Sequence, residues 1–209
     1  MAKLLACVAA IICLLPVPAD SFNWDQIMSK TRPALLHVRS PEGSSCTGFV
    51  VGSKGDYVIT ANHCLGSSAI MRVDGIEVNV LIKSLTQDLA LLRNDRLSHD
   101  RLKLSVNTQL TDLVLAGGYA HGWAVPIFIE DIVVELDATI PHVGAGFIIV
   151  RGANRHEAVH GGMSGGPVIN IKGEIVGIVQ VGSSEDRQMG MRPSAAIMDF
   201  VRTYEDAKK

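Results

Sequence analysis

Three short segments of the chain carry side chains that could attack a carbonyl group. They are residues 60–64 (TANHC), 87–92 (QDLALL) and 161–167 (GGMSGGP). A serine hydroxyl is a poor nucleophile at neutral pH, so a neighbouring imidazole must take its proton during the attack and later return it to the leaving group. His63 and Ser164 are suited to these two roles, and the glycines around Ser164 let the backbone approach a substrate closely. This pattern predicts nucleophilic catalysis.

These segments resemble the histidine, aspartate and serine motifs of the trypsin/chymotrypsin-like serine peptidase family. The matching residues are TANHC, DLALL and GMSGGPVIN, and the resemblance covers nearly the whole chain after residue 19. One such motif is weak evidence, whereas three in the order His, Asp, Ser, each at an apparent strand end, are specific. The resemblance implies a triad of His63, Asp88 and Ser164, in which the carboxylate fixes the tautomer of the imidazole. Asp74 and Asp95 lie in the same interval, but the Leu-Ala-Leu-Leu run after Asp88 favours Asp88.

The resemblance also assigns residues to the oxyanion hole and to the pocket for the side chain before the cleaved bond. The oxyanion donors would be the backbone N–H groups of Gly162 and Ser164. The pocket residues would be Ala158, Val159, His160, Val179, Gln180, Val181 and Gly182. No carboxylate is expected at the pocket floor, so small or aliphatic side chains are expected there rather than Lys or Arg. His160 offers the alternative of a polar pocket.

Two departures from the digestive members of the family point to another branch. Met163 stands where those enzymes carry the aspartate that pairs with a new N-terminus, and residues 20–23 (DSFN) lack their Ile-Val-Gly-Gly. Activation by N-terminal insertion is therefore not expected. The sequence is more similar to the bacterial HtrA/Deg-like branch, whose strand-to-helix ending is matched by residues 191–195 (MRPSA).

Relatives of that branch usually add a PDZ domain, for which we expect no residues to remain in this chain. They often trimerise through an N-terminal segment. Phe22 and Trp24 are candidates for such a contact, and packing on their own barrel is the alternative. Monomer and homo-oligomer therefore both stay open.

The elements that must position the reactive side chains are short strands. Apolar runs rich in β-branched residues, separated by Gly, Asn, Asp and Ser, predict one block of strands before the polar stretch 93–107 and a second block after it. The expected strands are 34–38, 48–51, 57–60, 69–73, 76–82 and 89–92, then 113–116, 125–136, 147–150, 167–170, 174–181 and 188–191. Without helix-period stretches between them, these blocks predict an all-β fold of two packed six-stranded antiparallel barrels, chymotrypsin-like in form.

The domain limits follow from the same pattern. We expect residues 20–209 to form one peptidase domain, with an N-terminal barrel at about 31–95 and a C-terminal barrel at about 108–192. A terminal α-helix is expected at about 194–206, with Ser194 as its N-cap. A further short helix is expected at 23–30, and residues 170–173 (NIKG) predict a hairpin turn.

Residues 1–19 are typical of a secretory signal peptide. Lys3 precedes an apolar run over 4–15, and two prolines and Ala19 come before the first acid. The run is shorter than the roughly 18–20 residues that span a bilayer, so we expect cleavage after Ala19 rather than a membrane anchor. The mature protein would then be secreted or periplasmic, without a stable membrane anchor.

Export changes the interpretation of the four cysteines. Cys7 and Cys13 would leave with the signal peptide, and Cys46 and Cys64 would remain as an even pair bound for an oxidising compartment. We expect these two to form a disulfide, which matches the family's bridge beside the catalytic histidine. Two buried free thiols are the alternative if the compartment is reducing.

Two further motifs suggest other enzymes. Residues 156–160 (HEAVH) match the zinc signature H-E-x-x-H, but the glycines that follow leave too little sequence for the required helix, and no third ligand is evident. Residues 162–166 match the G-x-S-x-G of α/β-hydrolases, which need a helix after the serine and place their histidine last. We therefore expect no metal and no cofactor. The non-enzyme alternative is a catalytically silent module that binds proteins, although no triad position is substituted.

The composition limits the classes of molecule that the chain is expected to bind. Hydrophobic residues make up 47% of the 209 residues, and the formal net charge is −2, so the chain should bury a core. Without an excess of Lys and Arg, nucleic acid is not expected as a partner. The expected partner is a protein or peptide substrate.

Overall fold

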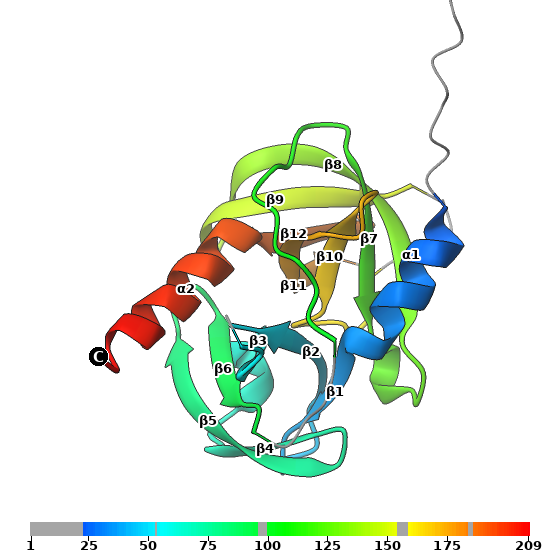
Figure 1. Ribbon diagram of the computed structural model, residues 1–209. Coiled ribbons are helices and arrows are strands. Elements are labelled where there is room, and N and C mark those ends of the chain that lie inside the picture. Colours follow the sequence, from blue (N-terminus) through cyan, green and yellow to red (C-terminus); the bar gives the residue numbers. More distant parts are fainter. Residues whose placement is uncertain (1–22, 53, 96–99, 154–158, 184–185) are drawn as a thin grey trace, which may run out of the picture.

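The computed structural model describes residues 23–52, 54–95, 100–153, 159–183 and 186–209. Within these residues the chain forms two closed antiparallel β-barrels of six strands each, followed by a C-terminal helix (Figure 1). The all-β fold with two packed barrels that the sequence predicts is confirmed.

The two barrels share one connectivity. The first contains β1 (Leu35–Arg39), β2 (Ser45–Val51), β3 (Tyr57–Ala61), β4 (Ile70–Val73), β5 (Ile76–Ser84) and β6 (Leu89–Arg93), in the spatial order β1-β2-β3-β6-β5-β4. The second contains β7 (Leu113–Gly118), β8 (Ile127–Ile140), β9 (Gly144–Gly152), β10 (Pro167–Asn170), β11 (Ile175–Ser183) and β12 (Gln188–Pro193), in the order β7-β8-β9-β12-β11-β10. Pairing of β1 with β4 closes the first barrel, and pairing of β7 with β10 closes the second.

Strands β3 and β6 are buried on both faces. Val58 and Leu92 fill the interior of the first barrel, whereas Ile59 and Leu91 pack toward β11 and the C-terminal helix. Phe200 of that helix belongs to the same hydrophobic cluster between the barrels. Burial on both faces explains why these strands appear in the sequence as continuous apolar runs rather than as alternating ones.

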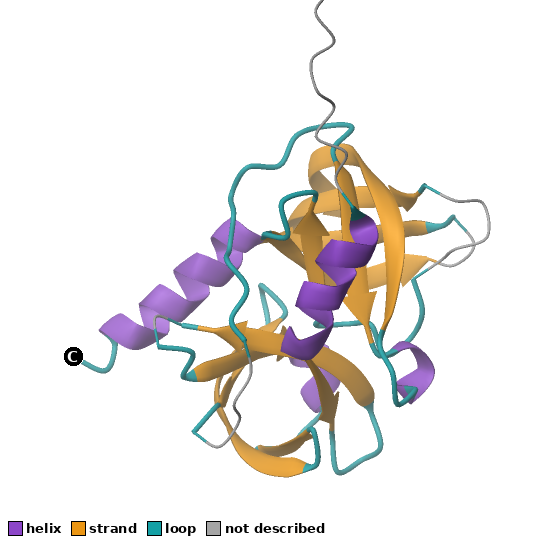
Figure 2. Cartoon of the chain, turned by 45° about the vertical axis from the view of Figure 1, so that its right-hand side comes forward, coloured by secondary structure: helices purple, strands orange, loops and turns teal. Residues whose placement is uncertain are grey.

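The two α-helices of the described residues lie outside the barrels (Figure 2). Helix α1 (Trp24–Thr31) has Asn23 as its N-cap, whose side chain accepts a hydrogen bond from the backbone N–H of Gln26. The 3-10 turn η1 (Arg32–Ala34) connects α1 to β1, and Arg32 Nη1 donates to the carbonyl oxygen of Pro126 at 2.7 Å. This bond holds the start of the first barrel against the second.

The C-terminal helix α2 (Ser194–Asp206) begins differently from the prediction. Pro193 is its N-cap and Ser194 is its first helical residue. The Ser194 hydroxyl donates to the carbonyl oxygen of Ser105 instead of capping the helix. The prediction of Ser194 as N-cap was therefore wrong, because Pro193 takes the cap position with an extended backbone (φ −65°, ψ 152°) and the helix begins one residue later.

None of the helices in the described residues is long and apolar enough to cross a membrane. The expected signal peptide, residues 1–19, and Phe22 lie outside the described residues. Trp24 is partly buried in the first turn of α1. Signal cleavage and the N-terminal oligomer contact stay predictions.

The fold brings the reactive segments to strand ends. His63 lies in the 3-10 turn η2 (Asn62–Leu65), directly after β3, and Asp88 directly precedes β6. Because Ala61 of β3 pairs with Leu89 of β6, the end of one strand lies beside the start of the other. Ser164 lies in the loop before β10 of the second barrel.

Candidate active site

His63 and Asp88 are hydrogen-bonded through both the ring and the backbone. Nδ1 of His63 lies 2.7 Å from Oδ2 of Asp88, and Oδ1 accepts the backbone N–H of His63 at 2.9 Å. Because an ionised carboxylate only accepts hydrogen bonds, this contact places the ring proton on Nδ1 and leaves Nε2 as an acceptor. The His63 side chain is 46% exposed, so a substrate can reach that nitrogen.

Asp88 is held in an unusual backbone conformation. Its φ of +52° lies in the left-handed region, which aspartate tolerates better than most residues. Its carbonyl oxygen accepts the backbone N–H of Asn62 at 3.1 Å and Nε2 of Gln180 at 2.8 Å. The direction of the carboxylate is thus fixed by groups from both barrels.

Gln180 is a buried positioning residue that links the second barrel to this turn. Its side-chain amide donates to the carbonyl oxygens of Gln87, at 2.7 Å, and of Asp88, and its Oε1 has no hydrogen-bond partner among the described residues. Gln180 is expected in the substrate pocket from the sequence, but its side chain points to the Asp88 turn. A β-bulge between Val179 and Val181 disrupts the register of β11 there, and nothing in the sequence signals it.

Thr47 of β2 anchors the loop that carries Ser164. Its hydroxyl donates to the carbonyl oxygen of Gly162 at 2.8 Å, and its backbone N–H donates to the carbonyl oxygen of Ser164 at 2.9 Å. The same hydroxyl accepts the backbone N–H of Tyr119 at 2.9 Å. The side chain of Met163 is fully buried in the core of the second barrel, which explains an apolar residue next to Ser164.

Several backbone N–H groups of the loop are already paired. The N–H of Met163 donates to the carbonyl oxygen of His160. The N–H of Gly165 donates to the carbonyl oxygen of Val179, and the N–H of Gly166 to that of Met163. The N–H groups of the two expected oxyanion donors, Gly162 and Ser164, have no hydrogen-bond partner in the part of the chain that the structure describes. The Ser164 hydroxyl likewise makes no hydrogen bond to a described residue, so it does not contact His63 Nε2 at hydrogen-bond distance.

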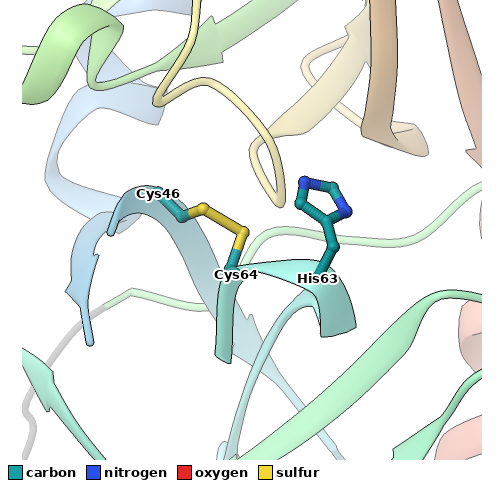
Figure 3. A group of neighbouring side chains, drawn as sticks. All are labelled: Cys46, His63 and Cys64. Atoms are coloured by element: carbon teal, nitrogen blue, oxygen red, sulfur yellow. A yellow bond between two sulfur atoms is a disulfide. The ribbon is translucent and has the colours of Figure 1, made fainter. Parts of the chain in front are cut away.

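The expected disulfide between Cys46 and Cys64 is present, which confirms that prediction. Figure 3 shows the bridge and the imidazole of His63 on adjoining segments, and Cys64 Sγ lies 3.9 Å from the carbonyl oxygen of Ser164. The two sulfur atoms and the His63 ring are close enough to surround an ion. Because both sulfurs are bonded to each other, neither is a thiolate, and the group does not suit a metal. His156 and Glu157 lie outside the described residues.

The expected pocket residues are brought together only in part. Val159 lies beside Gly182, where an added Cβ would approach its side chain to 3.1 Å. Val179 belongs to the core of the second barrel, and Val181 packs on the smaller cluster around Phe147. Ala158 lies outside the described residues.

A surface cavity of about 360 Å³ adjoins β11. Val181 and Gly182 line it together with Ile140 and Met189. Glu135 and Asp186 add two acidic side chains to the lining. The cavity therefore offers both aliphatic surface and negative charge.

Comparison with known sequences agrees with this geometry. The family model described as a trypsin-like peptidase domain matches residues 46–178, which include His63, Asp88 and Ser164. A probable periplasmic serine endoprotease of Pseudomonas putida, DegP-like, is 30% identical over 154 residues, covering 67% of this chain and 31% of the relative. The chain thus spans about a third of that relative's length. The match agrees with the resemblance to the HtrA/Deg-like branch.

Solved structures share the fold. The Rv3671c protease of M. tuberculosis H37Rv, in an inactive form, has a TM-score of 0.72 at 21% identity, with 85% of this chain and 92% of that chain covered. The serine endoprotease from Yersinia pestis has a TM-score of 0.69 at 22% identity, with 87% of this chain and 66% of that chain covered. At these low identities, both matches show a shared fold rather than a close similarity of sequence. With the family model matching well over half of the chain, this protein belongs to the trypsin-like peptidase domain family.

Proposed function

We propose that this protein is a serine endopeptidase that cleaves peptide bonds through His63, Asp88 and Ser164. The observation that carries the proposal is the arrangement around Ser164. An imidazole backed by a carboxylate lies on the first barrel, and the N–H groups of Gly162 and Ser164, on the loop of the second, have no hydrogen-bond partner among the described residues. Family membership and the DegP-like relative support the same reaction.

The proposed reaction assigns a role to each group. Ser164 Oγ attacks the carbonyl carbon of the peptide bond, and its proton moves to Nε2 of His63. The resulting imidazolium is stabilised by the Asp88 carboxylate on Nδ1, while the N–H groups of Gly162 and Ser164 bind the oxyanion. His63 then gives the proton to the leaving amine. Water, activated by the same imidazole, hydrolyses the acyl-enzyme and restores the serine.

Substrate binding has to bring the serine and histidine together. No hydrogen bond joins Ser164 Oγ and His63 Nε2 in this structure. Catalytic hydrogen bonds are often long without substrate and tighten only in the complex. We infer that a peptide on β11 draws the two side chains into contact.

For the cleaved position we propose small or aliphatic side chains. The aliphatic side chain of Val159 lies against Gly182, which favours small or apolar side chains there. Peptides that differ only in Val, Ala or Lys before the cleaved bond should therefore be hydrolysed faster with Val or Ala. A faster rate with Lys would show that Glu135 and Asp186 of the adjoining cavity govern the preference instead.

We further propose that the protein acts in the periplasm or after secretion. The Cys46–Cys64 disulfide suits an oxidising compartment, and the DegP-like relative is described as periplasmic. Mass measurement of the exported protein should give a new N-terminus at Asp20. A retained Met1 in the processed fraction would contradict the signal peptide.

A fluorophosphonate probe tests the proposed nucleophile. The folded protein should be labelled on Ser164, and the Ser164→Ala variant should be neither labelled nor able to cleave a denatured protein substrate. Ser105, which lies on the segment between the barrels, provides a matched serine whose replacement by Ala should leave labelling intact. A protein that binds unfolded substrates but shows neither labelling nor cleavage would support the silent binding module.

A further inference from the structure

Two histidines face each other beside the serine loop. His121 belongs to the 3-10 turn η3 (Ala120–Gly122), and His160 lies just before Gly161. Their ring centroids are 4.9 Å apart, with the planes tilted by 43°. His160 ends the HEAVH segment, yet its ring neighbour in the described residues comes from a separate part of the chain.

Both rings have nitrogen atoms available to a ligand. His121 is exposed and His160 is partly exposed. Among the described residues, neither ring takes part in a hydrogen bond or an ion pair, and the rings contact each other and, for His121, the ring of Trp123. Imidazole nitrogen is a preferred ligand of Zn²⁺ and Cu²⁺.

The separation of the rings suits a single shared ion. A Zn–N bond of about 2.1 Å puts the metal about 3.2 Å from each ring centre, so two rings on one tetrahedral ion have centroids about 5 Å apart. The observed separation of 4.9 Å matches this value. Solvent can supply the remaining ligands because the site is open.

The same two segments also hold the oxyanion loop. The backbone N–H of His121 donates to the carbonyl oxygen of Gly161 at 2.6 Å. Gly162 packs so closely on this backbone that an added Cβ would collide with the carbonyl oxygen of Tyr119 and come within 3.1 Å of the backbone nitrogen of His121. An ion on both rings would therefore tie the loop to η3 at a second point, through side chains.

We propose that His121 and His160 form a Zn²⁺-binding site that clamps the serine loop to η3. The site lies outside the triad and does not depend on the proposed peptidase activity. Zinc binding selects the present loop arrangement, in which the N–H groups of Gly162 and Ser164 have no partner among the residues that the structure describes.

Copper quenching of Trp123 tests the site directly. The Trp123 ring lies 5.6 Å from the His121 ring, and the chain has two tryptophans, so Trp24→Phe leaves Trp123 as the single fluorophore. Cu²⁺ binds such ligands more tightly than Zn²⁺ and quenches nearby fluorescence. We expect saturable quenching with one ion per chain, reversed by excess Zn²⁺. Calorimetric titration of the unmodified chain with Zn²⁺ should give the same stoichiometry.

Matched variants identify the ligands. His121→Asn and His160→Asn should each weaken binding at least tenfold, and asparagine tolerates the left-handed φ of +51° at position 121. His142, an exposed histidine with a φ of +63°, provides the control, and His142→Asn should not change binding. Circular dichroism checks that each variant is folded. Unchanged affinity in both ligand variants, or loss of binding in His63→Ala, would overturn the site.

Hydrogen exchange tests the clamp. Zn²⁺ should slow exchange of the amides at 161–166 in the unmodified chain and not in His121→Asn. Equal exchange with and without bound Zn²⁺ would overturn the clamp even if the ion binds.

Discussion

Asp88 combines a required side chain with a backbone conformation that few residues tolerate. Asparagine has nearly the same shape and also tolerates a positive φ, so Asp88→Asn should fold. Its amide, however, can donate to Nδ1 of His63 and favours the wrong tautomer. We expect kcat to fall by about 10⁴-fold, as in comparable enzymes.

Steady-state cleavage of a peptide substrate measures this loss, and a thermal unfolding scan shows that the variant is folded. Asp95 also lies between His63 and Ser164 in the sequence, but it follows the C-terminal end of β6 and pairs with Arg93 at 3.6 Å. Asp95→Asn should therefore keep its activity. Equal losses in the two variants would remove Asp88 from the triad.

Gln180 gives a second prediction because its amide holds the Asp88 turn from the other barrel. Gln180→Ala removes two hydrogen bonds of 2.7 and 2.8 Å and should lower the free energy of unfolding by about 2–3 kcal/mol. Because Asp88 is then less well fixed, kcat should fall about tenfold with little change in KM, which corresponds to about 1.4 kcal/mol.

The matched control for this variant is Gln87→Ala. Gln87 offers only its backbone carbonyl oxygen to Gln180, so removing its side chain leaves that bond intact. Peptide kinetics of both variants should differ in kcat alone. A raised KM with an unchanged kcat would instead support a place for the Gln180 side chain in the substrate pocket.

The loop before β10 depends on glycine where the backbone is crowded. Gly162 has a φ of +95° and packs against the backbone of Tyr119 and His121. Gly162→Ala should displace one oxyanion donor and lower kcat by about 10²–10³-fold. Gly173 has a similar φ of +76° in the β10–β11 hairpin, with open space around it.

Gly173→Ala should therefore cost only about 1–2 kcal/mol of backbone strain and leave kcat unchanged. Denaturant unfolding and peptide kinetics on both variants separate strain from crowding. If Gly162→Ala lost no more activity than Gly173→Ala, the loop would not position an oxyanion donor.

The strands were predictable because buried strands are visible in the sequence as short runs of apolar residues. The apolar runs at 57–60 and 89–92 became β3 and β6, and the NIKG turn became the β10–β11 hairpin. The direction of side chains along β11 was not predictable, because the bulge between Val179 and Val181 depends on packing against β12. The motifs therefore indicated His63 and Asp88 as neighbours, but not Gln180 behind them.

The two barrels meet in the hydrophobic cluster around α2 and again beside the serine loop. There His37 of β1 stacks on Tyr119 of the second barrel, with centroids 4.5 Å apart and planes within 6°. The Tyr119 hydroxyl donates to the carbonyl oxygen of Leu35 at 3.2 Å. Because Tyr119 also touches Gly162, the contact between the barrels supports the catalytic loop.

This contact predicts how the stability of the whole protein depends on pH. Burial lowers the pKa of His37 below its usual 6.5, the Arg39 cation acts in the same direction, and Asp74 opposes both. Arg39 Nε donates to Nε2 of His37 at 3.3 Å, and Ser45 Oγ lies 2.7 Å from the same nitrogen, so protonation would place a donor against a donor. The folded state therefore favours the neutral ring.

The sign follows from proton linkage. Below about pH 6.5 the unfolded chain binds a proton at His37 before the folded chain does, so the free energy of unfolding falls as the pH drops and levels off below the folded pKa. Urea unfolding between about pH 7.5 and pH 5 measures that slope. His37→Gln should reduce it, whereas His142→Gln, at an exposed turn, should keep it. The same slope in all three proteins would mean that acid does not weaken the contact between the barrels at His37.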